Sequence, residues 1–227
     1  MKHIVVFSGA GMSAESGLKT FRDNGGLWEN YKVEDVATPQ AWAKDPEMVL
    51  HFYNLRRTQL FKAKPNQAHF SIAELEKKYK ISVITQNIDD LHERAGSTNV
   101  IHLHGELKKV RSERHTDLIY QWDKEELHLG ENCELGFQLR PHVVWFGEEV
   151  PMMELAFRVS QTADILIVVG TSLNVYPAAN VVNFVPDNCI NYLIDPKPPI
   201  YNTVSNFSIL KAGAEEGMRI LSQKLNA

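Results

Sequence analysis

The stretch Ile4-Val5-Val6-Phe7-Ser8-Gly9-Ala10-Gly11-Met12-Ser13-Ala14 decides the fold class of this chain. A continuous run of apolar and mostly β-branched residues is typical of a strand buried on both faces of a parallel sheet. The glycines that follow let the backbone turn tightly and approach a pyrophosphate closely. The stretch therefore predicts the first strand of a Rossmann-like domain, although an ordinary tight strand-to-helix turn has the same residues.

Similar apolar runs recur along the chain, with helical patterns between several of them. The further predicted strands are residues 81–85, 100–103, 143–146, 165–169, 192–194 and 207–210. The predicted helices run from Asp45 to about Lys62, from Asn66 to Tyr79, and over residues 152–162, 177–185 and 214–224. Alternating strands and helices predict an α/β fold with a doubly wound parallel sheet.

Two segments interrupt this alternation. Residues 30–75 have helical patterns and no strand, and residues 107–142 are polar, charged and weakly periodic. We predict that these two insertions form a second, smaller helical lobe, whereas residues 1–29, 76–106 and 143–227 form the Rossmann-like domain. A cleft between two lobes is a common place for a ligand.

Composition excludes several classes of protein. Hydrophobic residues make up 44% and charged residues 23% of the 227 residues, which is ordinary for a globular protein. A net charge of −4 argues against general binding to nucleic acid or acidic membranes, and no apolar run approaches the ~20 residues of a membrane span. Because Cys133 and Cys189 are the only cysteines, a cytoplasmic protein without disulfides is expected. The oligomeric state is not encoded in a recognisable pattern.

The segment after the glycine-rich turn departs from that of a dehydrogenase. A dehydrogenase would continue with a second strand that ends in an acidic residue. Here the chain instead has Thr20-Phe21-Arg22-Asp23-Asn24-Gly25-Gly26-Leu27-Trp28, which is typical of a loop. An arginine in such a loop can hold a phosphate through two hydrogen bonds. The sequence therefore favours a dinucleotide ligand without hydride transfer.

Polar residues follow the next two predicted strands. Gln86-Asn87-Ile88-Asp89 comes after residues 81–85, and His104 comes after residues 100–103. Amides at such strand ends can bind sugar hydroxyls, and an aspartate can accept from a carboxamide, although Asp89 or Asp90 can also cap a helix. His104 is a candidate general base, whereas His102 is expected to be structural.

These motifs together resemble the sirtuin family over nearly the whole chain. The matching segments are residues 9–17, Thr20-Phe21-Arg22, residues 85–89, His104-Gly105, residues 143–148 and residues 170–173. The resemblance implies a Rossmann-like domain with a small second lobe, and an NAD-dependent protein-lysine deacylase. In this family NAD is cleaved at its nicotinamide bond, and the acyl group of a modified lysine passes to the ribose.

The resemblance also implies individual roles. His104 would activate a ribose hydroxyl, and Asn87 and Gln86 would position ribose and water. The residues expected to bind NAD are Gly9, Ala10, Gly11, Ala14, Phe21, Arg22, Trp28, Gln86, Asn87, Ile88, Asp89, Gly170, Thr171, Ser172, Leu193, Asp195 and Ala212. The acyl-lysine protein substrate is expected to contact Tyr53 and Arg56 and a strand-like track of Val143, Val144, Trp145, Phe146 and Gly147.

Tyr53 and Arg56 point to the nature of the acyl group. They are three residues apart in the predicted helix, so they share one face. By helix statistics alone, Tyr53 would be a core residue and Arg56 a surface charge. However, Tyr-x-x-Arg at this place resembles the desuccinylase branch of the sirtuins, as does the small Ala14. A phenol beside a guanidinium can bind a carboxylate, which predicts a preference for succinyl and malonyl groups.

The sequence departs from the family at its zinc site. Sirtuins usually bind zinc through two Cys-x-x-Cys pairs, which would fall near Ser112 and His115 and near Asn132 and Leu135, where only Cys133 is present. We predict no metal, although His115, His128 and Cys133 remain an alternative site. Apolar packing would then hold the lobe through Leu118, Ile119, Tyr120, Trp122, Leu127, Leu129, Leu135, Phe137 and Leu139.

Three other functions remain as alternatives. The same loss of nicotinamide serves protein ADP-ribosyl transfer, and a degenerate relative would be a non-catalytic sensor of NAD or ADP-ribose. A nicotinamide oxidoreductase is disfavoured by the missing second strand and acid. The presence of His104 together with Tyr53 and Arg56 favours deacylation.

Overall fold

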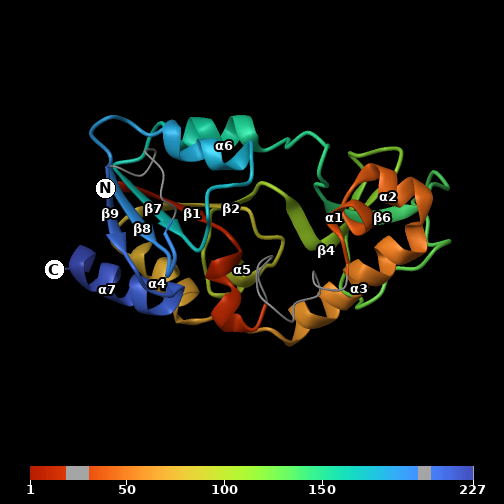
Figure 1. The fold of residues 1–227 in the computed structure, drawn as a ribbon, viewed down its shortest axis with the longest axis horizontal. Helices are drawn as coiled ribbons and strands as arrows, with labels where there is room; N and C mark the ends of the chain where they lie inside the picture. The colour runs from red at the N-terminus through yellow and green to blue at the C-terminus, as the bar shows by residue number, and fades with distance from the viewer. Residues whose placement is uncertain (19–30, 199–205, 227) are drawn as a thin grey trace.

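The computed structural model describes residues 1–18, 31–198 and 206–226, which form two lobes of unequal size (Figure 1). The larger lobe is built on a six-stranded parallel sheet with the order β3-β2-β1-β7-β8-β9. Its strands are β1 (His3–Ser8), β2 (Lys80–Thr85), β3 (Val100–His102), β7 (Ile165–Val169), β8 (Ile190–Ile194) and β9 (Phe207–Leu210). The strand order reverses between β1 and β7, as it does in dinucleotide-binding folds. The predicted α/β class is confirmed.

Helices cover both faces of this sheet, because alternate residues of its strands point to opposite sides. Ile4 and Val6 of β1 pack under α4 (Gln67–Leu75) and α7 (Ala214–Asn226). Val5 and Phe7 pack under α6 (Met153–Ser160) and the 3₁₀ helix η4 (Ala178–Asn183). Figure 1 shows α6 on one side of the sheet and α4 with α7 on the other. Helix α4 therefore packs on the large sheet, although its sequence lies in the insertion that was assigned to the smaller lobe.

The smaller lobe contains helices and an antiparallel sheet. Its helices are α1 (Val33–Val36), α2 (Pro39–Lys44) and α3 (Pro46–Lys62), and its strands β4 (Gly105–Ser112), β5 (Ile119–Gln121) and β6 (Leu139–Val143) pair in the order β5-β4-β6. The smaller lobe and its helices were predicted, whereas its antiparallel sheet was not. The prediction of a strand of the large sheet over residues 143–146 was wrong. Val143 is the last residue of β6, where it pairs with Gly105 in the small sheet.

Helix α3 begins where its sequence predicted. The Asp45 side chain accepts from the backbone N–H of Met48 at 2.9 Å, and Pro46 occupies the first turn. Further along, Arg57 is fully buried, and its Nε donates to the Leu107 carbonyl oxygen at 3.0 Å. This arginine therefore joins α3 to β4 within the smaller lobe.

The core of the smaller lobe is apolar. Leu50, Val110, Leu127, Cys133 and Leu139 are buried, and half-buried Trp42, Leu118, Tyr120, Trp122 and Phe137 surround them. Three residues that were predicted to pack here are exposed instead, namely Ile119 (44%), Leu129 (44%) and Leu135 (55%).

The residues at the expected zinc positions do not fit that metal. Cys133 Sγ donates to Ser112 Oγ at 3.5 Å, and a serine hydroxyl is not among the usual ligands of structural zinc. Within residues 1–18, 31–198 and 206–226, no three His, Cys, Asp or Glu side chains gather as metal ligands would. The same residues include no helix of the length and apolarity needed to cross a membrane.

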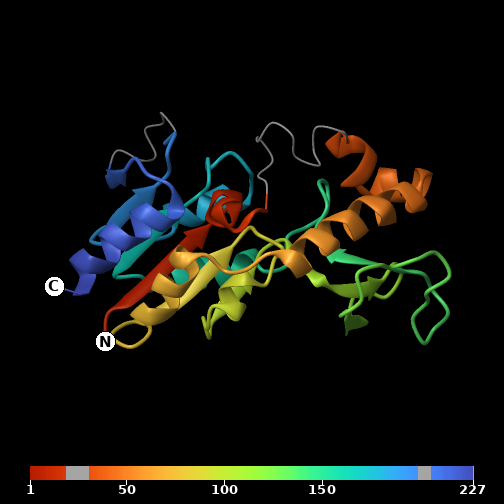
Figure 2. The same ribbon diagram turned by 90° about the horizontal axis from the view of Figure 1, so that it is seen from below.

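The long axis of the molecule runs from one lobe to the other. Figures 1 and 2 both place the two chain ends on the larger lobe, remote from α2 and α3. The chain thus leaves the larger lobe and returns to it, with His104 directly before the first residue of β4. The candidate base lies at the junction of the two sheets.

Candidate active site

A cavity of about 830 Å³ lies at the carboxyl ends of β1, β2 and β7 and continues to α3 of the smaller lobe. This is the edge where open α/β sheets bind ligands, and the volume lies within the range of ligand pockets. Most residues predicted for the site line it, namely Gly9, Ala10, Gly11, Ala14, Tyr53, Arg56, Gln86, Asn87, Ile88, Asp89, His104, Val143, Val144, Trp145, Phe146, Gly147, Gly170, Thr171, Ser172 and Asp195. The fold thus brings together residues from both lobes.

Two glycine turns meet at one end of the cavity. The Gly11 N–H donates to the Gly170 carbonyl oxygen at 2.8 Å, and a Cβ on Gly11 would lie only 2.7 Å from Gly170 Cα. Gly170 has a φ of +64°, which favours glycine. The chain continues from Gly9 as short 3₁₀ turns rather than as a long helix. The missing side chains let the two turns pack directly against each other at the edge of the cavity. A glycine-rich turn that follows a strand at such an edge fits the pyrophosphate of a dinucleotide.

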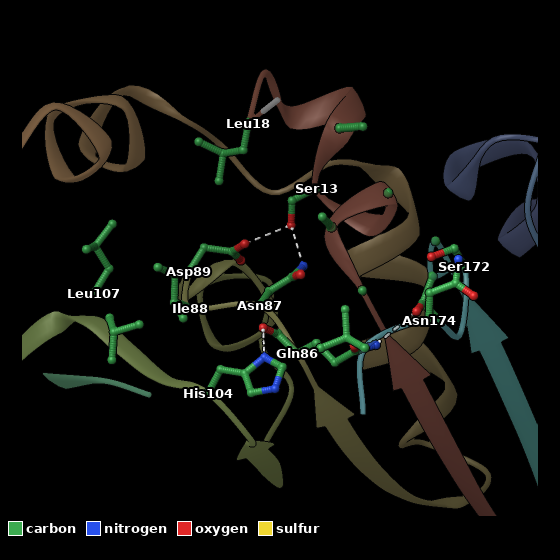
Figure 3. Close-up of a pocket in the computed structure, with 18 of the residues that line it drawn as sticks. Ser13, Leu18, Gln86, Asn87, Ile88, Asp89, His104, Leu107, Ser172 and Asn174 are labelled. Atoms are coloured by element: carbon green, nitrogen blue, oxygen red, sulfur yellow. Dashed lines mark hydrogen bonds between the residues drawn. The ribbon is translucent and has the colours of Figure 1, made fainter. Parts of the chain in front are cut away.

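A chain of buried hydrogen bonds holds the polar cluster (Figure 3). Ser13 Oγ donates to Asp89 Oδ2 at 3.0 Å, and Asn87 Nδ2 donates to Ser13 Oγ at 3.1 Å. Burial raises the pKa of Asp89, and the hydrogen bond from Ser13 offsets part of this rise. Ser13 was not predicted for the site, although it lies within the glycine-rich motif that was singled out.

His104 is oriented by the strand end beside it. Its Nδ1 lies 3.0 Å from the Gln86 carbonyl oxygen, which accepts only, so Nδ1 carries the hydrogen and Nε2 is left as the acceptor. Burial lowers the pKa of His104, and the hydrogen bond to Gln86 counteracts this only in part. The Gln86 side chain donates to Thr171 Oγ1 at 3.0 Å. A neutral imidazole can therefore accept a proton at neutral pH.

His102 lies nearby with a different partner. Its Nε2 is 2.7 Å from Glu93 Oε1, and its Nδ1 is 3.0 Å from the Asn87 carbonyl oxygen. Burial lowers the pKa of His102, but these two acceptors outweigh burial and leave the pKa raised. The side chain supports the backbone of Asn87 and does not line the cavity.

Helix α3 contributes Tyr53 and Arg56 from the opposite wall. Tyr53 is 3% exposed, and its hydroxyl accepts a hydrogen bond from Trp145 Nε1 at 3.0 Å. Burial raises the pKa of Tyr53 to about 12 and lowers the pKa of Arg56. The Arg56 guanidinium lies 5.9 Å from the centre of the Phe52 ring. A phenol and a guanidinium thus line the same buried end of the cavity.

The segment after β6 crosses between the lobes. The Val144 N–H donates to the His104 carbonyl oxygen at 2.9 Å, and the Phe146 N–H donates to the Ala37 carbonyl oxygen at 3.0 Å. The Trp145 N–H donates to Glu148 Oε2 at 2.8 Å. Because these three N–H groups are bonded within the chain, a peptide that pairs with this segment would use its other backbone groups.

Some predicted residues lie elsewhere. Leu193 of β8 is fully buried in the core and does not line the cavity. Ala212 does not line the cavity, whereas its neighbours Gly213 and Ala214 do. Asp195 lines it, with Oδ1 accepting from the Lys197 N–H at 2.7 Å. Phe21, Arg22 and Trp28 lie outside the described residues.

The cavity also has residues that the sequence analysis did not single out. They include Leu18, Ala37, Gln59, Leu60, Leu107, Val150, Asn174, Tyr176 and Lys197. Asn174 directly follows the Gly170-Thr171-Ser172-Leu173 motif, which was the one available signal for it. Leu60 of α3 and Leu107 of β4 are brought together only by the tertiary fold.

Comparison with known proteins agrees with this geometry. A model of the Sir2 family matches residues 9–177. An NAD-dependent protein deacylase of Bacteroides thetaiotaomicron is 52% identical over 230 residues, covering 99% of this chain and 98% of that protein. One from Helicobacter pylori is 50% identical over 225 residues, covering 99% and 96%.

A solved complex of a Sir2 homolog with NAD has a TM-score of 0.90 at 41% identity, covering 99% of this chain and 90% of that one. These relatives confirm the predicted enzyme class and its NAD dependence. The chain belongs to the Sir2 family, as its six ordered motifs predicted.

Proposed function

We propose that this protein is an NAD-dependent protein-lysine deacylase that prefers acyl groups ending in a carboxylate, such as succinyl and malonyl. The observation that carries the proposal is the position of Tyr53 and Arg56, which line the same cavity as His104. The relatives named as NAD-dependent protein deacylases support the general reaction. The acyl preference rests on the two α3 side chains.

The residues of the larger lobe prepare the reaction. Bound NAD supplies the ribose carbon from which nicotinamide leaves. His104 Nε2 accepts the proton of a ribose hydroxyl, because Nδ1 is committed to the Gln86 carbonyl. Asp89 accepts from the nicotinamide carboxamide, and Asn87 and Gln86 hold ribose and an ordered water. The turns at Gly11 and Gly170 receive the pyrophosphate.

The residues of the smaller lobe choose the acyl group. A carboxylate accepts one hydrogen bond from the Tyr53 hydroxyl and others from the Arg56 guanidinium, and charge-assisted bonds in a buried place are strong. The methyl end of an acetyl group accepts none of them. The pair therefore strengthens binding of a succinyl or malonyl lysine and leaves acetyl-lysine with weaker binding.

The test compares succinyl-lysine and acetyl-lysine peptides of one sequence, with NAD, and identifies products by mass spectrometry. We expect the wild type to have a higher kcat/KM for the succinyl-lysine peptide than for the acetyl-lysine peptide. In Arg56→Met, kcat/KM for the succinyl-lysine peptide should fall about a hundredfold, because the buried succinyl carboxylate loses its guanidinium partner. Lys62→Met is the matched control, since it removes a positive charge from an exposed end of the same helix. The control should keep the wild-type preference.

The products separate the alternatives. Preference for acetyl, together with no effect of Arg56→Met, would overturn the acyl assignment and leave the family intact. ADP-ribose attached to protein would instead support an ADP-ribosyltransferase. If neither peptide causes consumption of NAD, and His104→Tyr behaves as the wild type does, the protein is a sensor.

A further inference from the structure

The hydrogen bond between Trp145 and Tyr53 has a fixed direction. Trp145 Nε1 lies 3.0 Å from the Tyr53 hydroxyl oxygen. An indole N–H only donates, whereas a phenol both donates and accepts. The phenol oxygen therefore accepts from the indole, and its own hydrogen is directed to a different acceptor.

The indole itself is held on several sides. Trp145 is 2% exposed, and its backbone N–H donates to Glu148 Oε2 at 2.8 Å. The Arg140 guanidinium lies 3.2 Å from the centre of the indole ring and is bonded to both carboxylate oxygens of Glu148, at 2.6 and 3.1 Å. Because backbone, ring face and N–H are all engaged, the indole does not turn away from the phenol.

We propose that Trp145 is a positioning residue that fixes the polarity of the acyl receptor, so that the receptor offers only hydrogen-bond donors to the end of the acyl chain. This inference rests on the proposed function. The Tyr53 hydroxyl and the Arg56 guanidinium are then both donors, and the matching ligand is one that only accepts. A carboxylate has this property, and a carboxamide of the same shape does not.

The physical cost of the wrong ligand is an unpaired polar group. A carboxamide turns its oxygen toward one donor, and its NH₂ group then faces the other donor. Such a mismatch at a buried site costs free energy, and sites built in this way reject isosteres strongly. Burial raises the pKa of Tyr53 to about 12, so the phenol keeps its hydrogen near neutral pH.

The test compares kcat/KM for succinyl-lysine with that for succinamoyl-lysine, whose chain ends in a carboxamide. In the wild type we expect the acid to exceed the amide by about a hundredfold. Trp145→Phe keeps an aromatic ring and removes the N–H, so the phenol becomes able to accept from the amide. The acid-to-amide ratio should then fall by about tenfold.

Trp42→Phe is the matched control. Trp42 lies 5.7 Å from Trp145 in the same aromatic cluster, but its Nε1 donates to Glu113 at 3.1 Å. The change therefore removes an indole N–H from the cluster without touching Tyr53, and the acid-to-amide ratio should match that of the wild type. An equal fall in this control would overturn the proposal, because loss of packing would then explain the effect.

A double-mutant cycle shows whether Trp145 acts through Tyr53. In a Tyr53→Phe background, Trp145→Phe should leave the acid-to-amide ratio unchanged, because the phenol is already absent. The same fall in both backgrounds contradicts the inference. Thermal unfolding in the presence of ADP-ribose establishes that each variant is folded.

A second measurement does not need a folded Trp145 variant. The protein has four tryptophans, so its amide-correlation NMR spectrum contains indole N–H signals that can be followed. In Tyr53→Phe one indole signal should shift and exchange faster with solvent than in the wild type. If no indole signal responds, the bond between Trp145 and Tyr53 does not exist in solution, and the proposal is overturned.

The outcomes separate this inference from the proposed function. If the wild type prefers acetyl to succinyl, both fail. If the wild type prefers succinyl but Trp145→Phe leaves the acid-to-amide ratio unchanged, only the polarity argument fails, and Tyr53 and Arg56 remain the acyl receptor.

Discussion

His104 is kept neutral by its surroundings. Burial disfavours the charged imidazolium, and the Gln86 carbonyl opposes this only in part, so the pKa of His104 lies below its ordinary value. The same carbonyl determines which ring nitrogen is free. The residue is thus oriented by a backbone atom, and no carboxylate is needed to place it.

This environment predicts a particular pH dependence. A base works only when deprotonated, so kcat/KM should stay constant as pH falls through 6.5 and decline only at lower pH, as His104 gains a proton. The measurement is kcat/KM for an acetyl-lysine peptide between pH 5 and 9, since the acetyl group does not titrate. A decline centred above pH 6.5 would contradict the lowered pKa.

Some residues of the site could be predicted from the sequence, and others could not. Gln86, Asn87, Asp89 and His104 follow strand ends, and a motif that follows a strand can be read from the chain alone. The bond between Ser13 and Asp89 joins residues 76 positions apart. Such a partnership depends on how β1 and β2 lie side by side, so the sequence analysis did not include Ser13.

Among the elements, α7 contacts the sheet through a glycine. A Cβ at Gly217 would lie 2.2 Å from Ile194 Cγ2 of β8. Alanine normally stabilises a helix relative to glycine by about 1 kcal/mol. At this contact the added methyl group would be forced into Ile194, and this overpacking costs about 1 to 3 kcal/mol, which exceeds the gain in helix propensity.

Gly217→Ala should therefore lower the free energy of unfolding, despite the better helix propensity of alanine. Urea denaturation measures the change through the transition midpoint. Gln223→Ala is the control, because residue 223 lies on the exposed face of the same helix and should change stability by less than about 0.5 kcal/mol. A more stable Gly217→Ala protein would show that α7 moves away from β8 at little cost.

The antiparallel sheet was the element that sequence analysis missed. In β4 the buried Leu107 and Val110 are surrounded by Glu106, Lys108 and Lys109, so the segment has the composition of a polar loop. By contrast, residues 143–146 form a continuous apolar run and were assigned to the parallel sheet. The first error arose because a strand in a small sheet shielded on one face lacks the continuous apolar pattern of a doubly buried strand. The second arose because residues 143–146 have that pattern without belonging to the parallel sheet.

At the scale of the whole molecule, the smaller lobe is held by packing. Its core joins Leu50 of α3 to Val110, Leu127 and Leu139, and Arg57 ties the helix to β4. These contacts do not involve a metal. The apolar contribution of such a core is proportional to the buried area and is unaffected by a chelator.

Removal of divalent metal should consequently leave the protein as stable as before. We expect the same Tm by calorimetry with and without EDTA, and no rise in Tm when zinc is added. Leu127→Ala serves as the positive control, since Leu127 is fully buried and its truncation should cost about 2 to 5 kcal/mol. A lower Tm in EDTA would mean that a metal does stabilise the fold.

The overall architecture followed from the sequence more completely than the boundary between lobes did. Continuous apolar strands and the glycine turn predicted the doubly wound sheet. The amphipathic pattern of α4 identified a helix, but it did not say which sheet would cover its apolar face. That choice depends on α7, which contacts α4 and lies more than a hundred residues further along the chain.

The bond between Trp145 and Tyr53 joins positions that are 92 residues apart. It therefore has a consequence for how this chain diverges from its ancestors. Genetic recombination with a breakpoint between these positions would combine the phenol of one parent with the partner of another. Such a chimera would mispair its acyl receptor wherever the two parents differ at either position. Exchange of everything after residue 150 leaves the inherited pair intact.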